Sequence, residues 1–319
     1  MRARFHLPSF YEHYKFNLVF TEMLRNAPQF FREGFEIASF YGAFSPSVWN
    51  GGRTVGGGIC SERYVRTVLE TFNSRGIPLR FTFTNPALKE EHLHDEFCNM
   101  VMRLADNGMN EAIVNSPILE QYIRETYPGF KLTSSTCKRI TDGERLAQEL
   151  EKDYSIVVLD YDLNHRFDIL EGLPHKEKLE ILVNACCDAD CKVRREHYRI
   201  IGEQQIYYNQ HLKEHPGVPF DPYEYDDTRD HPAIKCRCYD RNIFDIKSLP
   251  NHISPDEIWG RYISMGFEQF KIEGRTSRPL NLLETYMYYL IKPELRTEAR
   301  FMFLHNLEAN GVVRIDGKV

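Results

Sequence analysis

The chain has 319 residues, of which 42% are hydrophobic and 13% aromatic, so it carries enough apolar material for a folded core and is not a disordered chain. Its formal net charge of −6 excludes an overall basic field and argues against nonspecific nucleic-acid binding, while leaving room for a local basic groove. The sequence shows neither the apolar core of a signal peptide nor a run of roughly 18 apolar residues, so we expect a cytoplasmic protein without a membrane span.

Short apolar segments alternate with stretches of helical periodicity, which is typical of a parallel sheet. We expect an N-terminal helix, helices at the C-terminal end, and eight strands between them at residues 35–44, 78–84, 111–115, 131–135, 156–161, 179–184, 233–239 and 269–273. Eight strands, mostly followed by helices, predict an α/β fold, a TIM-like (β/α)8 barrel of parallel strands. We expect one domain over residues 1–319, with the barrel core at about 35–290. An open doubly wound sheet is the alternative, but no Gly-x-Gly-x-x-Gly follows a strand.

One segment interrupts this alternation. Residues 215–231 are rich in Pro, Asp and Tyr and show no periodicity, which predicts an irregular loop insertion. Long loops without regular structure are often functional. An acidic surface loop and a lid over a site are both compatible with this composition.

Five of the eight cysteines fall in two tight groups, Cys186-Cys187-Asp-Ala-Asp-Cys191 and Cys236-Arg-Cys238. Both groups lie at or near the ends of expected strands, and the carboxyl ends of barrel strands share one face, so the two groups can converge in space. In a cytoplasmic protein, clustered thiols indicate metal binding or redox chemistry more than structural disulfides. The alternative is a coincidence of small buried core residues.

Four thiolates suit either a tetrahedral zinc ion or a [4Fe–4S] cluster. The second cysteine pair is spaced more closely than zinc ligands usually are, whereas a cubane cluster tolerates varied spacing, so we favour iron–sulfur and keep zinc as the alternative. Adjacent Cys186 and Cys187 are not both expected to be ligands, because their side chains should diverge, and His197 is a nitrogen ligand for the zinc alternative. The predicted ligands of the metal or cofactor are Cys187, Cys191, Cys236 and Cys238.

The last expected strand reads Phe270-Lys-Ile-Glu-Gly-Arg275 and ends in charged residues. Alternation places Lys271 and Glu273 on one face, where buried charges must be paired or belong to a site. Arg275 at the strand end is suited to a carboxylate or phosphate. Asp160 ends another strand and is either an acid–base group or a turn former. The predicted catalytic residues are Glu273, Arg275 and Asp160.

Two stretches, Gly266-Phe-Glu-Gln-Phe-Lys-Ile-Glu-Gly-Arg275 and Leu182-Val-Asn-Ala-Cys-Cys-Asp-Ala-Asp-Cys191, make the chain resemble the collagenase-like peptidase family U-32. Softer similarity extends over about residues 35–290. The resemblance implies a TIM-like barrel with a [4Fe–4S] cluster on four cysteines. The family that the chain resembles includes oxygen-independent hydroxylases that act on transfer RNA, ribosomal RNA or the ubiquinone ring, and some of these take the oxygen from prephenate.

By position, the resemblance implies Cys187 and Cys191 as ligands, together with one or both of Cys236 and Cys238. The cysteine spacing departs from the family pattern, so the fourth ligand stays open among Cys186, Cys60, Cys236 and Cys238. The hypothesis is therefore an iron–sulfur barrel enzyme that hydroxylates a small molecule or an RNA base without oxygen. Arg275 would orient an anionic substrate or donor, and the net charge does not favour RNA.

Two other functions remain as alternatives. A collagenase-like peptidase or other hydrolase lacks support from motifs, since neither His-Glu-x-x-His nor Gly-x-Ser-x-Gly occurs. A noncatalytic binding protein stapled by a metal is the other alternative. The sequence specifies no oligomeric state.

Overall fold

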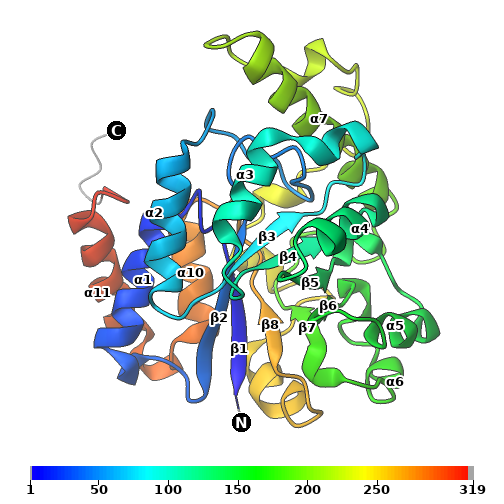
Figure 1. The fold of residues 1–319 in the computed structure, drawn as a ribbon. Helices are drawn as coiled ribbons and strands as arrows, with labels where there is room; N and C mark the ends of the chain where they lie inside the picture. The colour runs from blue at the N-terminus through cyan, green and yellow to red at the C-terminus, as the bar shows by residue number, and fades with distance from the viewer. Residues whose placement is uncertain (1, 315–319) are drawn as a thin grey trace.

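A computed structural model describes residues 2–314 and shows a closed barrel of eight parallel strands that follow one another in chain order (Figure 1). β1 closes the barrel by pairing with β8 at Phe5 and Phe270. This arrangement confirms the predicted TIM-like barrel. The strands are β1 (Ala3–Pro8), β2 (Phe35–Gly42), β3 (Leu79–Phe83), β4 (Glu111–Val114), β5 (Lys131–Ser134), β6 (Ile156–Val158), β7 (Leu179–Leu182) and β8 (Gln269–Lys271).

The structure differs from the expected strands at two places. β1 was not predicted, because it does not have the pattern of a simple apolar strand. Its polar His6 faces the barrel interior, and its apolar Phe5 is buried on the outer face of the barrel. Residues 233–239 were wrongly predicted as a strand and form turns that lead into the 3-10 helix η7 (Cys238–Asp240). A barrel already closed by β1 and β8 offers no strand edge for that segment.

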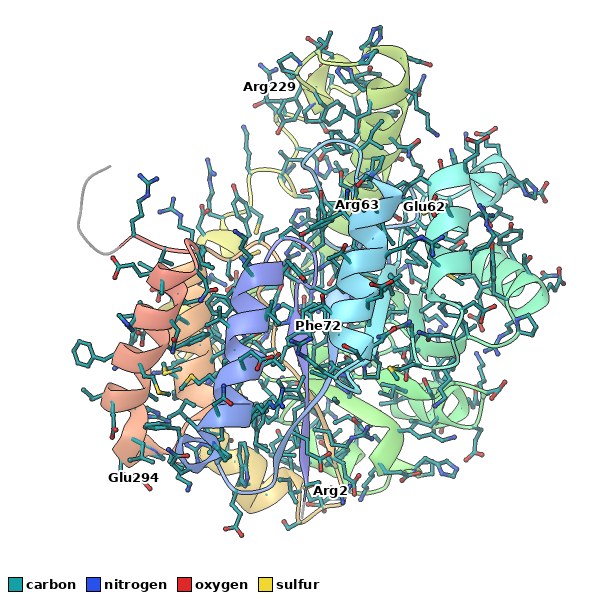
Figure 2. All side chains as sticks on the ribbon, turned by 60° about the vertical axis from the view of Figure 1, so that its left-hand side comes forward. Arg2, Glu62, Arg63, Phe72, Arg229 and Glu294 are labelled. Carbon is teal, nitrogen blue, oxygen red and sulfur yellow. The ribbon has the colours of Figure 1, made fainter. Side chains whose placement is uncertain are left out.

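Helices cover the outside of the barrel, and an N-terminal helix and C-terminal helices are present (Figure 1). Figure 2 shows how α2 does this: Phe72 points toward the strands and is fully buried, whereas Glu62 and Arg63 are exposed. No helix within residues 2–314 is both long and apolar enough to cross a membrane. The helices are α1 (Tyr14–Asn26), α2 (Glu62–Asn73), α3 (Glu96–Ala105), α4 (Pro117–Thr126), α5 (Gly143–Leu150), α6 (Phe167–Leu170), α7 (Arg194–Glu214), α8 (Ile243–Ile246), α9 (Pro255–Glu257), α10 (Pro279–Leu290) and α11 (Arg296–Ala309).

The 21-residue helix α7 extends beyond the barrel and carries the irregular segment at its far end (Figure 1). Within residues 215–231 the regular structure is one short 3-10 helix, η6 (Pro222–Glu224). The segment folds back on α7 through His211, whose ring nitrogens lie 2.9 Å from the Tyr225 hydroxyl and 3.0 Å from the Val218 carbonyl oxygen. Residues 215–231 therefore form a protrusion at the end of α7.

Four buried side chains form a charged layer across the barrel interior, here called the paired layer: His6, Arg80, Glu180 and Lys271. Arg80 donates to Glu180, and the Lys271 Nζ lies 2.9 Å from the other Glu180 oxygen. Burial opposes ionisation of Glu180, but Arg80 and Lys271 hold its pKa well below the usual range. Burial and Arg80 lower the pKa of His6 to about 3, so its ring is neutral. Burying these charges is tolerable because they are paired with one another.

Candidate functional site

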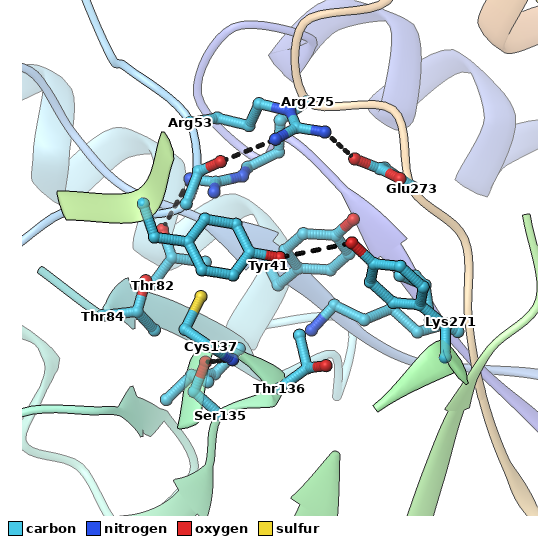
Figure 3. A pocket seen from close by; sticks show the side chains of 15 residues that line it. Tyr41, Arg53, Thr82, Thr84, Ser135, Thr136, Cys137, Lys271, Glu273 and Arg275 are labelled. Atoms are coloured by element: carbon cyan, nitrogen blue, oxygen red, sulfur yellow. Dashed lines mark hydrogen bonds and ion pairs between the residues drawn. The ribbon is translucent and has the colours of Figure 1, made fainter. Parts of the chain in front are cut away.

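A cavity of about 80 Å³ opens above the paired layer, at the carboxyl ends of the strands (Figure 3). This is the end where parallel barrels place their sites. The lining combines cations, hydroxyls and aromatic rings, and it comes from Tyr41, Gly52, Arg53, Thr82, Thr84, Ile113, Ser135, Thr136, Cys137, Tyr161, Leu182, Tyr198, Lys271, Glu273 and Arg275.

Arg275 is the most informative residue of this cavity. Its guanidinium donates to the Asn50 Oδ1 at 2.9 Å, the Thr82 Oγ1 at 2.9 Å and the Gly51 carbonyl oxygen at 2.8 Å. All three acceptors are neutral, and no carboxylate within residues 2–314 forms an ion pair with this guanidinium. Burial lowers the pKa of Arg275, and the more distant Glu12 carboxylate opposes this shift. A held guanidinium without a directly paired carboxylate is suited to bind an anion.

Glu273 is engaged differently, because its carboxylate pairs with Arg53. The other Glu273 oxygen accepts from the Cys186 backbone N–H at 2.9 Å. The Glu273 backbone N–H donates to the Asn184 Oδ1 at 2.6 Å, and the Asn184 amide returns a bond to the Glu273 carbonyl at 3.0 Å. These bonds join the ends of β7 and β8, so Glu273 is fixed beside the first cysteine group. It does not pair with Lys271, whose partner is Glu180.

Arg53 comes from a glycine-rich segment, residues 51–58, between β2 and α2. Besides Glu273, its guanidinium donates to the Cys186 Sγ at 3.1 Å. Burial opposes its charge, but Glu273 and Cys186 raise the pKa of Arg53 well above the usual value. The segment is held from α7, where Gln205 accepts from the Val55 N–H at 3.0 Å and Tyr208 accepts from the Gly58 N–H at 2.9 Å.

Three buried thiols meet beside this pair. The sulfur atoms of Cys186, Cys187 and Cys238 all lie within 4.8 Å of one another, and those of Cys187 and Cys238 are 3.6 Å apart. The expected convergence of the two cysteine groups is therefore confirmed. Arg241 donates to the Cys186 carbonyl at 2.7 Å and Asn251 donates to the Cys187 carbonyl at 3.0 Å, which fixes the turn that carries two of the thiols. We call these three residues the thiol group.

The donor set of the thiol group fits a metal. A tetrahedral zinc ion with sulfur ligands at about 2.3 Å separates those sulfurs by about 3.8 Å. The observed separations of 3.6 Å and up to 4.8 Å bracket that value. Three thiols leave a fourth position for another protein ligand, water or substrate.

The structure changes the predicted ligand set. Cys191 lies outside the thiol group, with its carbonyl oxygen bound by Arg139 at 3.2 Å, and Cys236 packs against the group without joining it. The expectation that Cys186 and Cys187 diverge is wrong. The chain leaves β7 at Leu182 and turns over residues 183–187, so strand alternation no longer sends neighbouring side chains to opposite faces. The reserve candidate Cys60 also lies outside the group, and burial raises its pKa to about 11.

Asp160 lies in an ion-pair network and does not line the cavity. It pairs with Arg194 at 3.0 Å and with Arg139 at 3.3 Å, and Asp162 pairs with the same two arginines at 2.8 Å. Burial raises the pKa of Asp160. Asp162 also accepts from the Asp190 N–H at 3.0 Å, so the network braces the loop that follows Cys187. Its position suits a structural role.

A larger cavity of about 830 Å³ lies against the outer side of the site and shares Arg53 with the inner cavity. His197 lines this outer cavity, with Tyr239, Arg278 and Asn281. His197 lies outside the thiol group. Sequence reasoning missed Arg53 and the aromatic walls Tyr161 and Tyr198. The one sequence signal for Arg53 was its position as the single arginine in the glycine-rich segment 51–58.

The fold and the site together define a (β/α)8 barrel whose mouth carries a possible thiolate metal centre beside a cation-lined cavity. No family model matches the sequence, and no curated protein matches it. The chain is similar in structure to the U32 peptidase Mk0906, with a TM-score of 0.48 and 14% sequence identity over 86% of this chain and 94% of that chain. That likeness concerns the overall fold.

Proposed function

We propose that this barrel is a metal-dependent enzyme for a small anionic substrate, and more narrowly an iron–sulfur enzyme that hydroxylates without oxygen. The observation that carries the proposal is the adjacency of the thiol group to a cavity in which Arg275 forms no ion pair with a carboxylate of residues 2–314. Glu273 joins the two, since it contacts Cys186 and lines the same cavity. All eight cysteines are free thiols, as a reducing cytoplasm would keep them.

In this proposal Cys186, Cys187 and Cys238 hold the metal. The fourth ligand is sought first at Cys236, which packs against the group and lies two residues from Cys238. A [4Fe–4S] cluster, when bound, supplies electrons or an open iron position. Bound zinc, the alternative, supplies a Lewis acid instead.

The remaining residues bind and orient the substrate. Arg275 binds the substrate anion, and Asn50 and Thr82 hold the guanidinium in place through its two Nη1 bonds. Tyr161 and Tyr198, whose hydroxyls are 3.4 Å apart, wall the cavity and limit access of water. Glu273 keeps Arg53 beside the Cys186 sulfur. Asp160 acts as a positioning residue in place of the catalytic role first predicted for it.

The hydrolase alternative draws on one observation, the 3.6 Å separation of the Cys187 and Cys238 sulfurs, which suits a single zinc ion. Zinc with an open position activates water for hydrolysis. The inner cavity of about 80 Å³ suits a small substrate better than a peptide. The small volume of the inner cavity therefore favours a small-molecule reaction over peptide cleavage.

Anaerobic purification followed by metal analysis, absorbance and electron paramagnetic resonance tests the proposal. We expect iron with a broad visible absorbance in the wild type and its loss in Cys187→Ala and Cys238→Ala. Cys98→Ala is the matched control, because Cys98 is equally buried but hydrogen-bonds Ser47, away from the thiol group. Colourless, metal-free wild type after anaerobic reconstitution would overturn the proposal, and stoichiometric zinc without iron would support the hydrolase.

A further inference from the structure

Lys271 places a primary amine at the floor of the inner cavity. Of the four residues in the paired layer, it is the one that also lines this cavity. Figure 3 shows its side chain reaching toward the middle of the cavity, between Tyr41 and Thr136. The Nζ lies 2.9 Å from the Glu180 Oε1 and 4.1 Å from the centre of the Tyr41 ring. The amine is therefore held in place and directed at bound substrate.

The surroundings of this amine favour its neutral, nucleophilic form. Burial lowers the pKa of Lys271 to about 8, Glu180 opposes this shift, and Arg80 and Arg275 add to it. The other groups that face it do not supply charge, since His6 is neutral and Tyr41 keeps its proton because burial raises its pKa. At pH 7 the neutral fraction is roughly 300-fold larger than for an exposed lysine. A desolvated lysine of this kind is a nucleophile toward carbonyl groups.

The same cavity holds a second handle for a ligand. Arg275 lines it and has only neutral hydrogen-bond acceptors within residues 2–314, so a ligand carboxylate can form the direct ion pair that Arg275 does not make there. The cavity volume of about 80 Å³ is several times the roughly 10–15 Å³ that one water requires. A small acid with a carbonyl group beside its carboxylate would satisfy both side chains.

We propose that Lys271 forms an imine with a small 2-oxo acid whose carboxylate is bound by Arg275. The amine nitrogen attacks the carbonyl carbon and forms the C–N bond, while the carbonyl oxygen takes up a proton and becomes a hydroxyl group. The nitrogen supplies that first proton, the hydroxyl takes a second proton from solvent and leaves as water, and the C=N bond forms as a protonated imine. No oxidant or reductant is consumed.

Two neighbours stabilise the product. The Glu180 carboxylate lies 2.9 Å from the nitrogen and balances the charge of a protonated imine. The Tyr41 ring lies against the same nitrogen and adds a cation–π contact. The imine draws electron density from the substrate carbon, which activates the neighbouring position. This inference shares the anion-binding role of Arg275 with the proposed function but is independent of the metal.

Reductive trapping with pyruvate and borohydride tests the imine on full-length protein, both as purified and after metal removal. We expect one reduced pyruvate adduct per chain by intact mass, mapped to Lys271, and a yield that rises between pH 7 and 9 with a midpoint near pH 8. Lys271→Arg, which keeps the charge beside Glu180, should abolish the adduct. Lys138→Arg is the matched control, because Lys138 is also partly buried and paired with a carboxylate, Glu149.

Circular dichroism in the near ultraviolet establishes that each variant is folded. Unlabelled Lys271 in folded wild type, or equal labelling of folded Lys271→Arg, would overturn the imine. Arg275→Gln tests the carboxylate anchor that the two proposals share. Loss of the pyruvate adduct in Arg275→Gln supports binding of the substrate carboxylate by Arg275, whereas unchanged trapping in this variant would overturn that role of Arg275. A metal-free protein that still forms the adduct supports the imine and contradicts only the metal-dependent function.

Discussion

The barrel carries charge in two zones that differ in how the charge is balanced. In the paired layer, Arg80 and Lys271 share the carboxylate of Glu180, and Arg80 also lies 3.5 Å from Glu111. At the mouth, Glu273 is paired with Arg53, whereas Arg275 forms no ion pair within residues 2–314 and Glu12 acts on it only from a greater distance. The paired layer is complete without a ligand, whereas the mouth leaves Arg275 with neutral partners. Charge that is balanced internally stabilises the barrel, and charge that is not balanced is available for binding.

The largest expected effect comes from breaking the paired layer. Glu180→Gln leaves two buried cations without their shared counter-charge, so the free energy of unfolding should fall by about 3–5 kcal/mol. Urea unfolding measures this value. Glu273→Gln is the matched control at the mouth, where the partner Arg53 is less deeply buried. A loss below about 1 kcal/mol in Glu180→Gln would contradict the structural role of the layer.

Removing the unbalanced charge should affect binding and leave stability intact. Arg275→Gln deletes a cation that has only neutral acceptors, so the free energy of unfolding should stay constant or rise. Pyruvate binding, measured by calorimetry, should weaken by about 2 kcal/mol or more, because one partner of a charged pair is lost. Arg278→Gln, in the outer cavity, serves as the control. Equal pyruvate affinity in wild type and Arg275→Gln would remove the contrast between the zones.

Acid should weaken the fold partly through His6. Its pKa in the native state is about 3 and its ordinary value is 6.5, so the unfolded chain binds the proton first as the pH falls. The free energy of unfolding should therefore decrease from pH 6.5 downward, by at most about 1.4 kcal/mol per pH unit from this residue. Urea unfolding at pH 6.5 and pH 5 in wild type and His6→Gln measures the difference. Parallel slopes in the two proteins would show that His6 is not the source.

The smallest effect is expected at the Arg53–Glu273 pair. Its side chains are 13% and 21% exposed, so solvent screens the pair more than it screens the buried Arg80–Glu180 pair. Arg53→Gln should cost about 1 kcal/mol in unfolding free energy. A cost as large as that of Glu180→Gln would mean that the mouth is as tightly coupled to the fold as the paired layer.

The sequence was informative where a residue's role follows from its own strand. Short apolar segments between helical stretches predicted seven of the eight strands, and the expected number of eight was reached because residues 233–239 were counted in place of β1. The last strand predicted that Glu273 and Arg275 lie at the mouth. The sequence failed for β1, whose buried His6 is hydrogen-bonded by Ser39 on β2 and by Gln269 on β8, far along the chain. The thiol group depends on a turn after β7 that brings Cys186 inward beside Cys187. Local spacing does not encode that turn.

Arg53 could not be assigned from local pattern for the same reason. Its partners Glu273 and Cys186 come from β-strand ends that lie 220 and 133 positions away. A pattern within one segment carries no information on such distant contacts. The glycine content of residues 51–58 indicated only that the chain could approach closely there.

The segment that carries Arg53 has a further consequence. Gly52, Gly57 and Gly58 all adopt positive φ angles, and the guanidinium of Arg53 touches both a carboxylate and a thiol while lining the inner and outer cavities. Displacing this one side chain would change the lining of both cavities, release Glu273 and withdraw positive charge from Cys186 together. The shape of the two cavities and the charge beside the thiol group thus depend on the same side chain. Engineering the segment for wider access would retune the chemistry as well.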